Sequence, residues 1–294
     1  MENQATSDVD LVLLTRFNLP SEGPESLIRA EEGWLADRWG LFERYTVPSV
    51  RAQTDHDVHW IIYLDPQSPA WLIEHMTRLA DEGLVTPIYR ERVLPPELAA
   101  DIAATVGEAH GTLLATANLD NDDGLSPDFV ARLKDAAGPG RQAVYFEVGL
   151  IRSPTRLYLR HDPVNAFVAV TEPWDGAVTC WVDWHNLLSD HMPVRVVAGA
   201  PAWLQVVHGR NVSNRALGDL VDPAIYRDAF PGCLDDLVTP TTTTLLVEQY
   251  VVRPGRAVKE GVRAGVKAIF MRLFGKDGWT KVKHAWKRLT SRFS

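Results

Sequence analysis

The sequence predicts an α/β fold in which helices flank a mixed, mostly parallel sheet. In the first half of the 294-residue chain, short apolar segments alternate with amphipathic segments, a pattern typical of parallel β-α units. Beyond residue 143 the apolar segments follow one another with turns between them, which indicates additional strands. Apolar residues make up 46% of the chain, enough for a substantial core, and no apolar run reaches the ~18 residues of a transmembrane helix.

Three β-α repeats are predicted before residue 120. The expected elements are a strand over 9–17, a helix over 27–45, a strand over 58–65, a helix from 69, a strand over 84–89, a helix over 95–106 and a strand over 111–119. The first helix should end before Pro48, because proline lacks the amide proton that a helix interior needs. Ser68 is expected to cap the second helix, with Pro69 as its first residue.

The second half is predicted to be rich in strands. They are expected over 143–152, 156–162, 166–173 and 194–199, with a further strand from 203 that enters a loop. The Thr-rich stretch 239–250 is either a connector or an extended edge strand. Two basic helices, over about 256–274 and 279–293, form a C-terminal helical extension. We therefore expect a main domain over 1–252 and a basic tail over 253–294.

The net charge of −8 conceals a strong asymmetry. Residues 253–294 carry 12 Lys and Arg against two acidic residues, which leaves 18 basic and 36 acidic residues in 1–252. An acidic body with a basic tail indicates a partner for the tail. The polar, acidic N-terminus does not resemble a secretory signal, so a cytoplasmic location is expected. Cys180 and Cys233 have no metal-type spacing, and no disulfide framework is indicated.

The stretch LDNDDG, residues 119–124, gathers three carboxylates at the end of an apolar strand. Like charges this close repel one another unless a cation lies between them. A calcium loop of the EF-hand type is excluded, because its twelfth position falls on Ala131 and no helix precedes it. Two interpretations stay open at this point. The stretch is either a hydrated turn that starts the next helix, or half of a Mg²⁺ or Mn²⁺ site that water and the phosphates of a nucleoside diphosphate would complete.

Polar residues also follow the first two predicted strands. They are Thr15, Arg16 and Asn18 after the first strand and Asp65 after the second. Parallel strands bring their carboxyl ends to one edge of a sheet, where open α/β sheets bind their ligands. We therefore expect an active site at this edge, with the acidic cluster as part of it.

Four segments resemble the rhamnosyltransferase family: LVLLTRFN, PSVRAQ, VHWIIYLD and LDNDDGLSPDFV. The resemblance spans about residues 10–215 and leaves out the basic tail. This family is similar to the type A, Rossmann-like glycosyltransferases, which use nucleotide sugars and carry an Asp-x-Asp metal motif. The resemblance implies that fold, and a transfer of a sugar, rhamnose above all, from a dTDP-, UDP- or GDP-sugar to a glycan or lipid-linked acceptor. Mn²⁺ or Mg²⁺ is the implied cofactor.

The resemblance also implies roles for individual residues. Asp120 and Asp122 match the metal motif, with Asp123 assisting and His208 completing the coordination. For His208, a partly buried structural role is the alternative. The implied contacts to the nucleotide sugar come from Thr15, Arg16, Asn18, Asp65, Asp120, Asn211, Ser213 and Asn214.

If the transfer inverts the configuration of the sugar, a general base must deprotonate the acceptor hydroxyl. Similar inverting enzymes place this base between the metal motif and the late histidine, in the region of the Trp-rich segment 179–193. We expect Asp190 there, with Asp183 and His191 as further candidates; a plain turn at Asp190 is the alternative. The tryptophans of this region are expected either to stack on sugar rings or to pack in the core; they are Trp174, Trp181 and Trp184.

The basic tail is amphipathic and suits an anionic membrane surface, which would place the protein peripherally on the inner face of the membrane. Packing of the tail against the acidic body is the alternative. The acidic composition of the body disfavours nucleic acid as a partner.

Two other functions compete with glycosyl transfer. A nucleotidyltransferase or nucleotide-sugar pyrophosphorylase has a similar sheet and similar acidic metal sites, but the glycine-rich phosphate loop expected early in such enzymes is missing from residues 15–26. A sugar-binding or scaffold module would keep the fold without turnover.

Overall fold

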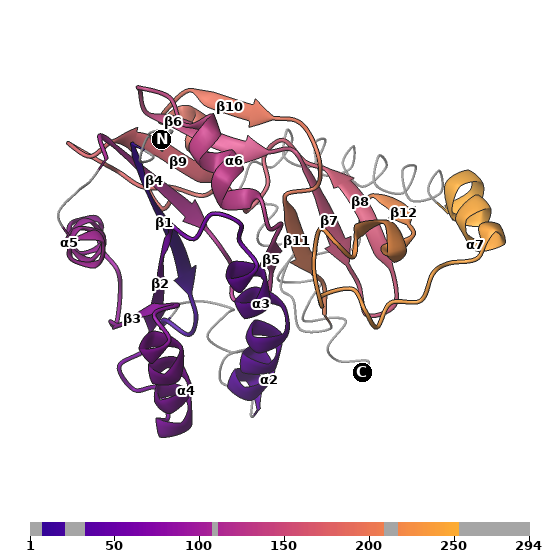
Figure 1. Cartoon of the computed structure of the whole chain (residues 1–294), viewed down its shortest axis with the longest axis horizontal. Coiled ribbons are helices and arrows are strands. Elements are labelled where there is room, and N and C mark those ends of the chain that lie inside the picture. The colour runs from indigo at the N-terminus through magenta and orange to yellow at the C-terminus, as the bar shows by residue number, and fades with distance from the viewer. Residues whose placement is uncertain (1–7, 21–32, 108–110, 209–216, 253–294) are drawn as a thin grey trace, which may run out of the picture. The chain divides into compact units, whose positions relative to one another are not determined.

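The structure is a computed structural model that describes residues 8–20, 33–107, 111–208 and 217–252 (Figure 1). The chain divides into two compact units, Met1–Thr239 and Pro240–Ser294. The sheets and the candidate site belong to the first unit. The boundary expected after residue 252 stays a prediction, and the two basic helices of the tail lie outside the described residues.

A seven-stranded sheet forms the centre of the first unit. Its order is β10-β6-β9-β4-β1-β2-β3, with β1 Val9–Arg16, β2 His59–Leu64, β3 Thr86–Tyr89, β4 Leu113–Asn118, β6 Gln142–Phe146, β9 Ala169–Pro173 and β10 Val194–Val197. Strands β4, β1, β2 and β3 are mutually parallel, while β9 runs antiparallel to β4 and β6. The predicted α/β class with a mixed sheet is therefore confirmed, and so are the three β-α repeats.

A second, five-stranded sheet follows, in the order β12-β8-β7-β11-β5. Its strands are β5 Gly124–Leu125, β7 Val148–Arg152, β8 Leu157–His161, β11 Trp203–Val206 and β12 Asp219–Val221. The single strand predicted over 143–152 is wrong, because the chain changes sheets at Glu147, between β6 and β7. The amide of Glu147 still donates to Val197 of the first sheet, whereas its carbonyl accepts from Asp162 beside the second. Both halves of the segment are buried, so its continuous apolar pattern does not reveal the change of partner.

Helices cover both faces of the seven-stranded sheet (Figure 1). One face packs against α2 Trp34–Leu41, α3 Val47–Arg51, α4 Ala70–Asp81 and α6 Phe129–Ala136. The other face packs against α5 Pro95–Val106 and the Trp-rich segment. Alternate residues of β1 divide between the two cores: Leu11 and Leu13 belong to the first, Val12 and Leu14 to the second. None of the described helices is long and apolar enough to cross a membrane.

Two predicted helix boundaries and the prediction for the Thr-rich stretch 239–250 need correction. The first helix continues past Pro48, because a π-helical turn, Phe42–Thr46, leads into α3 and leaves Pro48 in its first turn, where no amide proton is needed. Helix α4 is preceded by Pro69 rather than by Ser68, whose hydroxyl donates to the carbonyl of Asp65. The Thr-rich stretch is helical: α7 Thr242–Val247 begins after Thr241, whose hydroxyl accepts from the amide of Thr244.

The second sheet has its own apolar core, which includes Tyr45, Leu150 and Leu204. Within this sheet, the indole of Trp203 in β11 lies directly on Gly149 of the neighbouring strand β7. A Cβ atom added to Gly149 would come within 2.0 Å of the ring. The indole nitrogen donates to the carbonyl of Phe146, at the point where the chain leaves the first sheet (2.8 Å). This contact fixes the second sheet against the end of β6 and so against the edge where the acidic loop lies.

Candidate functional site

The acidic cluster lies where the two sheets meet. Strand β4 ends at Asn118, the loop 119–123 follows, and β5 then joins the second sheet beside β11. The amide of Leu119 donates to the carbonyl of Leu14, so the loop leaves the sheet next to the carboxyl end of β1. The predicted convergence of the β1, β2 and β4 ends on one edge is confirmed, because these strands are parallel neighbours.

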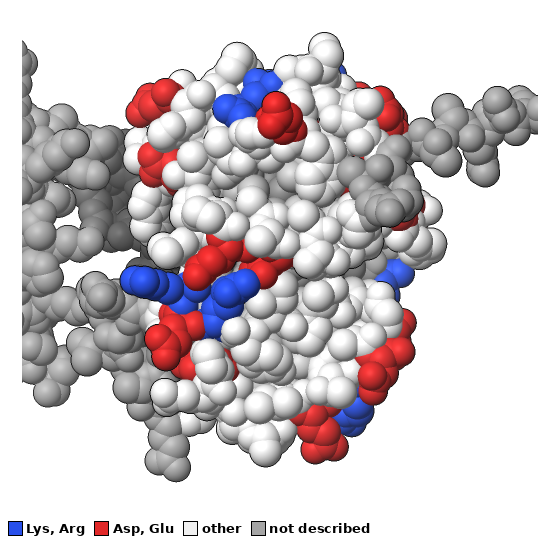
Figure 2. All heavy atoms as spheres, turned by 90° about the vertical axis from the view of Figure 1, so that its left-hand side faces the viewer, with Lys and Arg blue, Asp and Glu red and all other residues white. Residues whose placement is uncertain are grey.

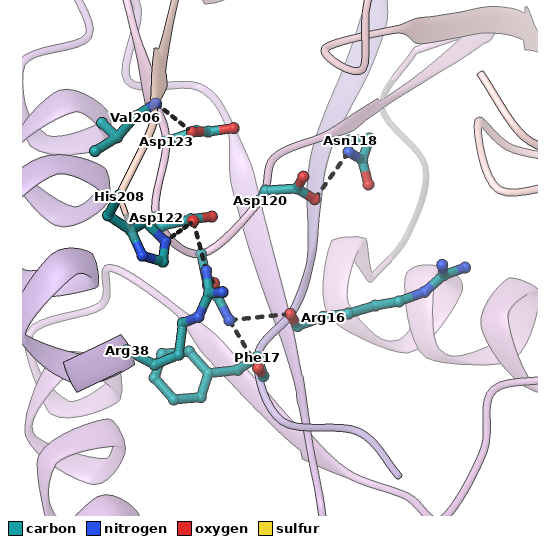
Figure 3. Close-up of polar contacts among 10 residues, drawn as sticks. Arg16, Phe17, Arg38, Asn118, Asp120, Asp122, Asp123, Val206 and His208 are labelled. Atoms are coloured by element: carbon teal, nitrogen blue, oxygen red, sulfur yellow. Dashed lines mark hydrogen bonds and ion pairs between the residues drawn. The ribbon is translucent and has the colours of Figure 1, made fainter. Parts of the chain in front are cut away.

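The three carboxylates of the loop have different partners (Figure 3). Oδ2 of Asp122 lies 2.5 Å from Nη1 of Arg38 and 3.0 Å from Nε2 of His208. Oδ1 of Asp123 accepts from the amide of Val206 at the end of β11 (2.8 Å). Asp120, which is exposed to solvent, accepts a longer bond from the amide group of Asn118 (3.3 Å).

Burial and the neighbouring negative charges raise the pKa values of two of these groups. Desolvation and the carboxylates of Asp122 and Asp120 raise the pKa of Asp123, which is 1% exposed, well above its usual value. Desolvation by the surrounding protein and the charge of Asp122 raise the pKa of Asp120 to about 6, although solvent still reaches this side chain. Burial and the repulsion among the carboxylates thus both disfavour full ionisation of the loop.

His208, which was predicted to complete the metal coordination, lies beside the acidic cluster, and its role as a ligand stays a prediction. His208 follows β11, which pairs with β5 immediately after the loop, and this pairing brings the imidazole to Asp122. Its side chain is 19% exposed. The three residues predicted at the diphosphate, Asn211, Ser213 and Asn214, lie outside the described residues.

Sequence reasoning missed Arg38 and Asn121. The side-chain amide of Asn121 donates to the carbonyls of Phe17 (2.7 Å) and Arg16 (3.3 Å), and its oxygen accepts from Arg38 (3.2 Å). Asn121 therefore joins the acidic loop to the end of β1, while Arg38 joins it to α2. Arg38 looks like any charged residue of an amphipathic helix, so the sequence carried no signal for its role.

Arg16 and Trp181 form one wall of the site. The guanidinium of Arg16 lies 4.1 Å from the centre of the Trp181 ring, a cation–π contact. The indole nitrogen of Trp181 donates to Oδ1 of Asn118 (2.8 Å), whose amide group in turn donates to Asp120. Trp181 is thus linked to the acidic loop through Asn118.

A strained turn presents Trp181 to the site. Thr179 has φ 68°, the only positive φ among the described non-glycine residues. The fully buried carboxylate of Glu172 accepts from the amides of Val178 and Thr179, and the hydroxyl of Thr116 accepts from the amide of Cys180. These three contacts hold a conformation that a threonine rarely adopts, and they fix the position of the next side chain, Trp181.

The other residues predicted at the nucleotide differ in accessibility. Thr15 is completely buried: its hydroxyl donates to the carbonyl of Leu119 and accepts from the indole of Trp60. Thr15 therefore supports the strand ends from inside the core and does not face solvent. Asn18 and Asp65 are partly exposed and adjacent, since the amide of Asp65 donates to the side chain of Asn18 (3.1 Å).

The Trp-rich segment brings two of its three candidate bases together. Nε2 of His191 lies 2.8 Å from Oδ2 of Asp183, and this contact, with the amide of Trp184, lowers the pKa of Asp183. Asp190 is exposed on a 3₁₀ turn, Leu188–Asp190. Of the tryptophans, Trp174 donates to Asp10 at the amino end of β1, and Trp184 is 74% exposed.

The donor chemistry of the acidic loop fits a hard divalent cation. Carboxylate oxygens are the ligands that Mg²⁺ and Mn²⁺ prefer, and a histidine is an acceptable ligand for Mn²⁺. Burial first, and then the neighbouring carboxylates, raise the pKa values of Asp120 and Asp123, and a bound cation would offset both effects. Among the residues that the structure describes, no three or more His, Cys, Asp or Glu side chains lie close enough together to hold a metal ion.

A family model described as "Putative rhamnosyl transferase" matches residues 10–220 of the chain. The chain belongs to this family. Rhamnosyl transferases are glycosyltransferases, so the family predicted from the four sequence segments is confirmed. No curated protein sequence matches the chain.

Several solved structures are distantly similar to this rhamnosyl transferase family member. Residues 1–349 of TarS from S. aureus align at 7% identity with a TM-score of 0.36; the alignment covers 67% of this chain and 60% of the TarS fragment. The mannosyltransferase PcManGT from Pyrobaculum calidifontis, solved with GDP-Man and Mn²⁺, aligns at 13% identity with a TM-score of 0.42, covering 95% of this chain and 87% of its own. GalNAc-T7, solved with UDP, GalNAc and Mn²⁺, aligns at 12% identity with a TM-score of 0.38, covering 70% of this chain and 44% of its own.

Proposed function

We propose that this protein is a metal-dependent glycosyltransferase that moves a sugar, with rhamnose favoured, from a nucleotide-sugar donor to a glycan or lipid-linked acceptor. The observation that carries the proposal is the cluster of three carboxylates after β4, at the edge where the neighbouring parallel strands end. Ligands of open α/β sheets bind at such an edge. Membership of the rhamnosyl transferase family supports the reaction class and the sugar.

Asp120, Asp122, Asp123 and His208 are the proposed ligands of a Mn²⁺ or Mg²⁺ ion. When bound, the ion would supply a Lewis acid for the departing nucleoside diphosphate. The protein's own contribution is to hold the carboxylates in place: the amide of Val206 orients Asp123, and Asn118 orients Asp120. The proposal would place Asn211, Ser213 and Asn214 near the same diphosphate.

The nucleotide is proposed to lie along the ends of β1 and β2. Arg16 is exposed there and carries a charge that suits phosphate, and Asn18 and Asp65 present polar groups to the same edge. Asp120, being exposed, is available to the ribose as well as to the metal. Thr15 contributes by fixing the end of β1 from within.

For the general base, the geometry favours the pair of Asp183 and His191 over Asp190. When Nε2 of His191 donates to Asp183, its Nδ1 is left as an acceptor that could take the proton of the acceptor hydroxyl. The buried carboxylate of Glu172 supports this segment through the turn at Thr179. Trp184 follows Asp183 directly in the chain, and its exposed ring offers a stacking surface for a sugar acceptor.

One assay separates the proposal from its two competitors. The full chain is incubated with dTDP-rhamnose, and then with UDP- and GDP-sugars, in the presence of Mn²⁺ or of a chelator. We expect slow release of nucleoside diphosphate that stops in the chelator. In a parallel incubation with a nucleoside triphosphate and a sugar 1-phosphate, release of pyrophosphate would instead identify a nucleotidyltransferase. Absence of both turnover and donor binding would identify a non-catalytic module.

The basic tail is proposed to attach the protein peripherally to an anionic membrane, where a lipid-linked acceptor would be found. Residues 253–294 carry the excess of basic side chains. On the face of the body shown in Figure 2, by contrast, basic and acidic side chains lie side by side. We expect the full chain to sediment with anionic vesicles at low salt and a chain ending at residue 252 to stay in solution. Equal sedimentation of the two chains would contradict this role of the tail.

A further inference from the structure

A guanidinium group already occupies the acidic loop. Arg38 belongs to α2, and its Nη1 atom lies 2.5 Å from Oδ2 of Asp122 (Figure 3). The same atom lies 3.2 Å from Oδ1 of Asn121. The side chains of Arg38 and Asp122 are 15% and 7% exposed. The ring of Trp34, one turn earlier on α2, lies 5.5 Å from the same guanidinium. The positive charge is therefore held inside the protein, at one of the proposed metal ligands.

This charge is needed as long as no other cation is present. A buried carboxylate without a partner is strongly destabilising, and Asp122 lies between two other carboxylates of the same loop. Asp120 and Asp123 accept hydrogen bonds from neutral groups, the side-chain amide of Asn118 and the backbone amide of Val206. Asp122 is the member of the cluster whose charge Arg38 balances.

A divalent cation and Arg38 would compete for this carboxylate. Both are positively charged, both seek the oxygens of Asp122, and at a few ångströms their mutual repulsion is strong in a site with little water. Oδ2 of Asp122 also holds His208, so it has little capacity for a third partner. Entry of the metal therefore favours departure of the guanidinium from Asp122.

We propose that Arg38 is an exchangeable counter-cation: it neutralises Asp122 in the metal-free protein, and it transfers to the diphosphate of the nucleotide when metal and nucleotide bind. The planar guanidinium can form two parallel hydrogen bonds to a phosphate group, and its long side chain allows the movement. The arriving diphosphate brings the negative charge that Arg38 then needs. This inference rests on the proposed function, because it requires a metal and a nucleoside diphosphate at this loop.

The proposal predicts two effects of opposite sign for Arg38→Gln. Loss of the competing charge should tighten the binding of Mn²⁺ in the absence of nucleotide by about tenfold, the effect of removing one charge-assisted contact. Loss of the phosphate ligand should weaken the binding of UDP, GDP or dTDP at saturating Mn²⁺ by about tenfold. A residue that only supported the loop would weaken both.

The experiment measures both affinities on the full chain. Free Mn²⁺ is followed by electron paramagnetic resonance in the absence of nucleotide, and binding of the three nucleoside diphosphates is followed by calorimetry at saturating Mn²⁺. Arg38→Lys retains the positive charge but lacks the planar guanidinium group that can form two hydrogen bonds to a phosphate. This variant should therefore keep the Mn²⁺ affinity of the wild type and lose part of the nucleotide affinity. Arg51→Gln is the matched control, because Arg51 of α3 forms an exposed ion pair with Glu82, the residue that follows α4.

The outcomes separate the two levels of the proposal. Suppose that the wild-type protein binds Mn²⁺ and that Arg38→Gln binds it equally or more weakly. This result would overturn the role of Arg38 and leave the metal site standing. Wild-type protein that binds no Mn²⁺ would overturn both. If Arg38→Gln does not fold, as judged by circular dichroism, the Arg38→Lys variant decides: nucleotide affinity equal to the wild type would overturn the transfer to phosphate.

Discussion

The Nε2 atom of His208 lies 3.0 Å from Oδ2 of Asp122, and this contact joins the end of β11 to the loop after β4. Arg38 reaches the same oxygen from α2. A single buried carboxylate therefore connects three segments that are far apart in the sequence. The repulsion expected among the three carboxylates is thus not evenly shared: Asp122 is balanced, and Asp120 and Asp123 are not.

The first prediction concerns Asp122. Asp122→Asn removes the charge that Arg38 and His208 share, so the metal-free protein should lose about 2 kcal/mol, or about 4–8 °C in Tm. Binding of Mn²⁺ should weaken at least tenfold. Thermal unfolding in chelator and a Mn²⁺ titration measure the two effects. Asp81→Asn, at an exposed carboxylate of α4, is the control, and an Asp122→Asn protein as stable as the wild type would contradict the prediction.

The second prediction concerns Asp120 and pH. The pKa of its carboxyl is about 6 in the folded protein, against the usual 3.8, so the folded state binds more protons than the unfolded state between these values. The carboxyl of Asp120 therefore does not lower the stability of the folded state below pH ~4. Above pH ~6, where it is ionised in the folded protein, it lowers that stability by the full amount. We expect Asp120→Asn to raise the Tm of the metal-free protein at pH 7.5 by about 2–4 °C, a shift of ~1 kcal/mol that allows for solvent at this side chain.

The control for this prediction is the same pair of proteins at pH 4, where their Tm values should nearly agree. An equal difference at both pH values would show that the effect comes from the changed amide and not from the charge. Mn²⁺ should remove the advantage of the variant at pH 7.5, because the ion would supply the missing positive charge.

The third prediction concerns Trp181. Trp181→Phe keeps an aromatic ring for Arg16 but loses the hydrogen bond that orients Asn118, so Asn118 should no longer hold Asp120 firmly. Mn²⁺ binding should weaken about two- to tenfold, the range expected for one hydrogen bond. Trp181→Ala should additionally weaken nucleotide binding, because Arg16 loses the aromatic ring against which its guanidinium packs. Trp184→Phe, at a side chain that is 74% exposed, should leave Mn²⁺ binding unchanged.

The fourth prediction distinguishes the candidate bases. His191→Gln and Asp183→Asn should lower kcat by about 10²- to 10⁴-fold, the usual contribution of a general base, without changing the affinity for donor or metal. Asp190→Asn should retain most of the activity. Steady-state kinetics with a transferable acceptor, together with calorimetry of donor binding, test this. A large loss in Asp190→Asn with normal activity in His191→Gln would restore Asp190 as the base.

Much of the fold was predictable because local patterns dominate in the first half of the chain. The strands over 9–17, 58–65 and 111–119 and the helix over 95–106 were predicted close to their observed positions. The second half was less predictable. The apolar run at 143–152 is buried along its whole length, and the choice between one strand and two depends on which partners lie beside it.

By itself, the sequence determined the α/β class, the parallel β-α repeats, and the acidic loop at a strand end, because each follows from residue types within a few positions of one another. Only the tertiary structure decided the partners of that loop. Arg38 and Trp181 come from two different segments and reach the loop or its neighbour Asn118 through side-chain contacts across sheets and helices. The contact of His208, a residue that only the family resemblance had linked to the loop, with Asp122 is of the same kind. Such contacts depend on strand pairing and helix packing over long sequence distances, and no local pattern encodes them. The charge that balances Asp122 is therefore a property of the folded chain.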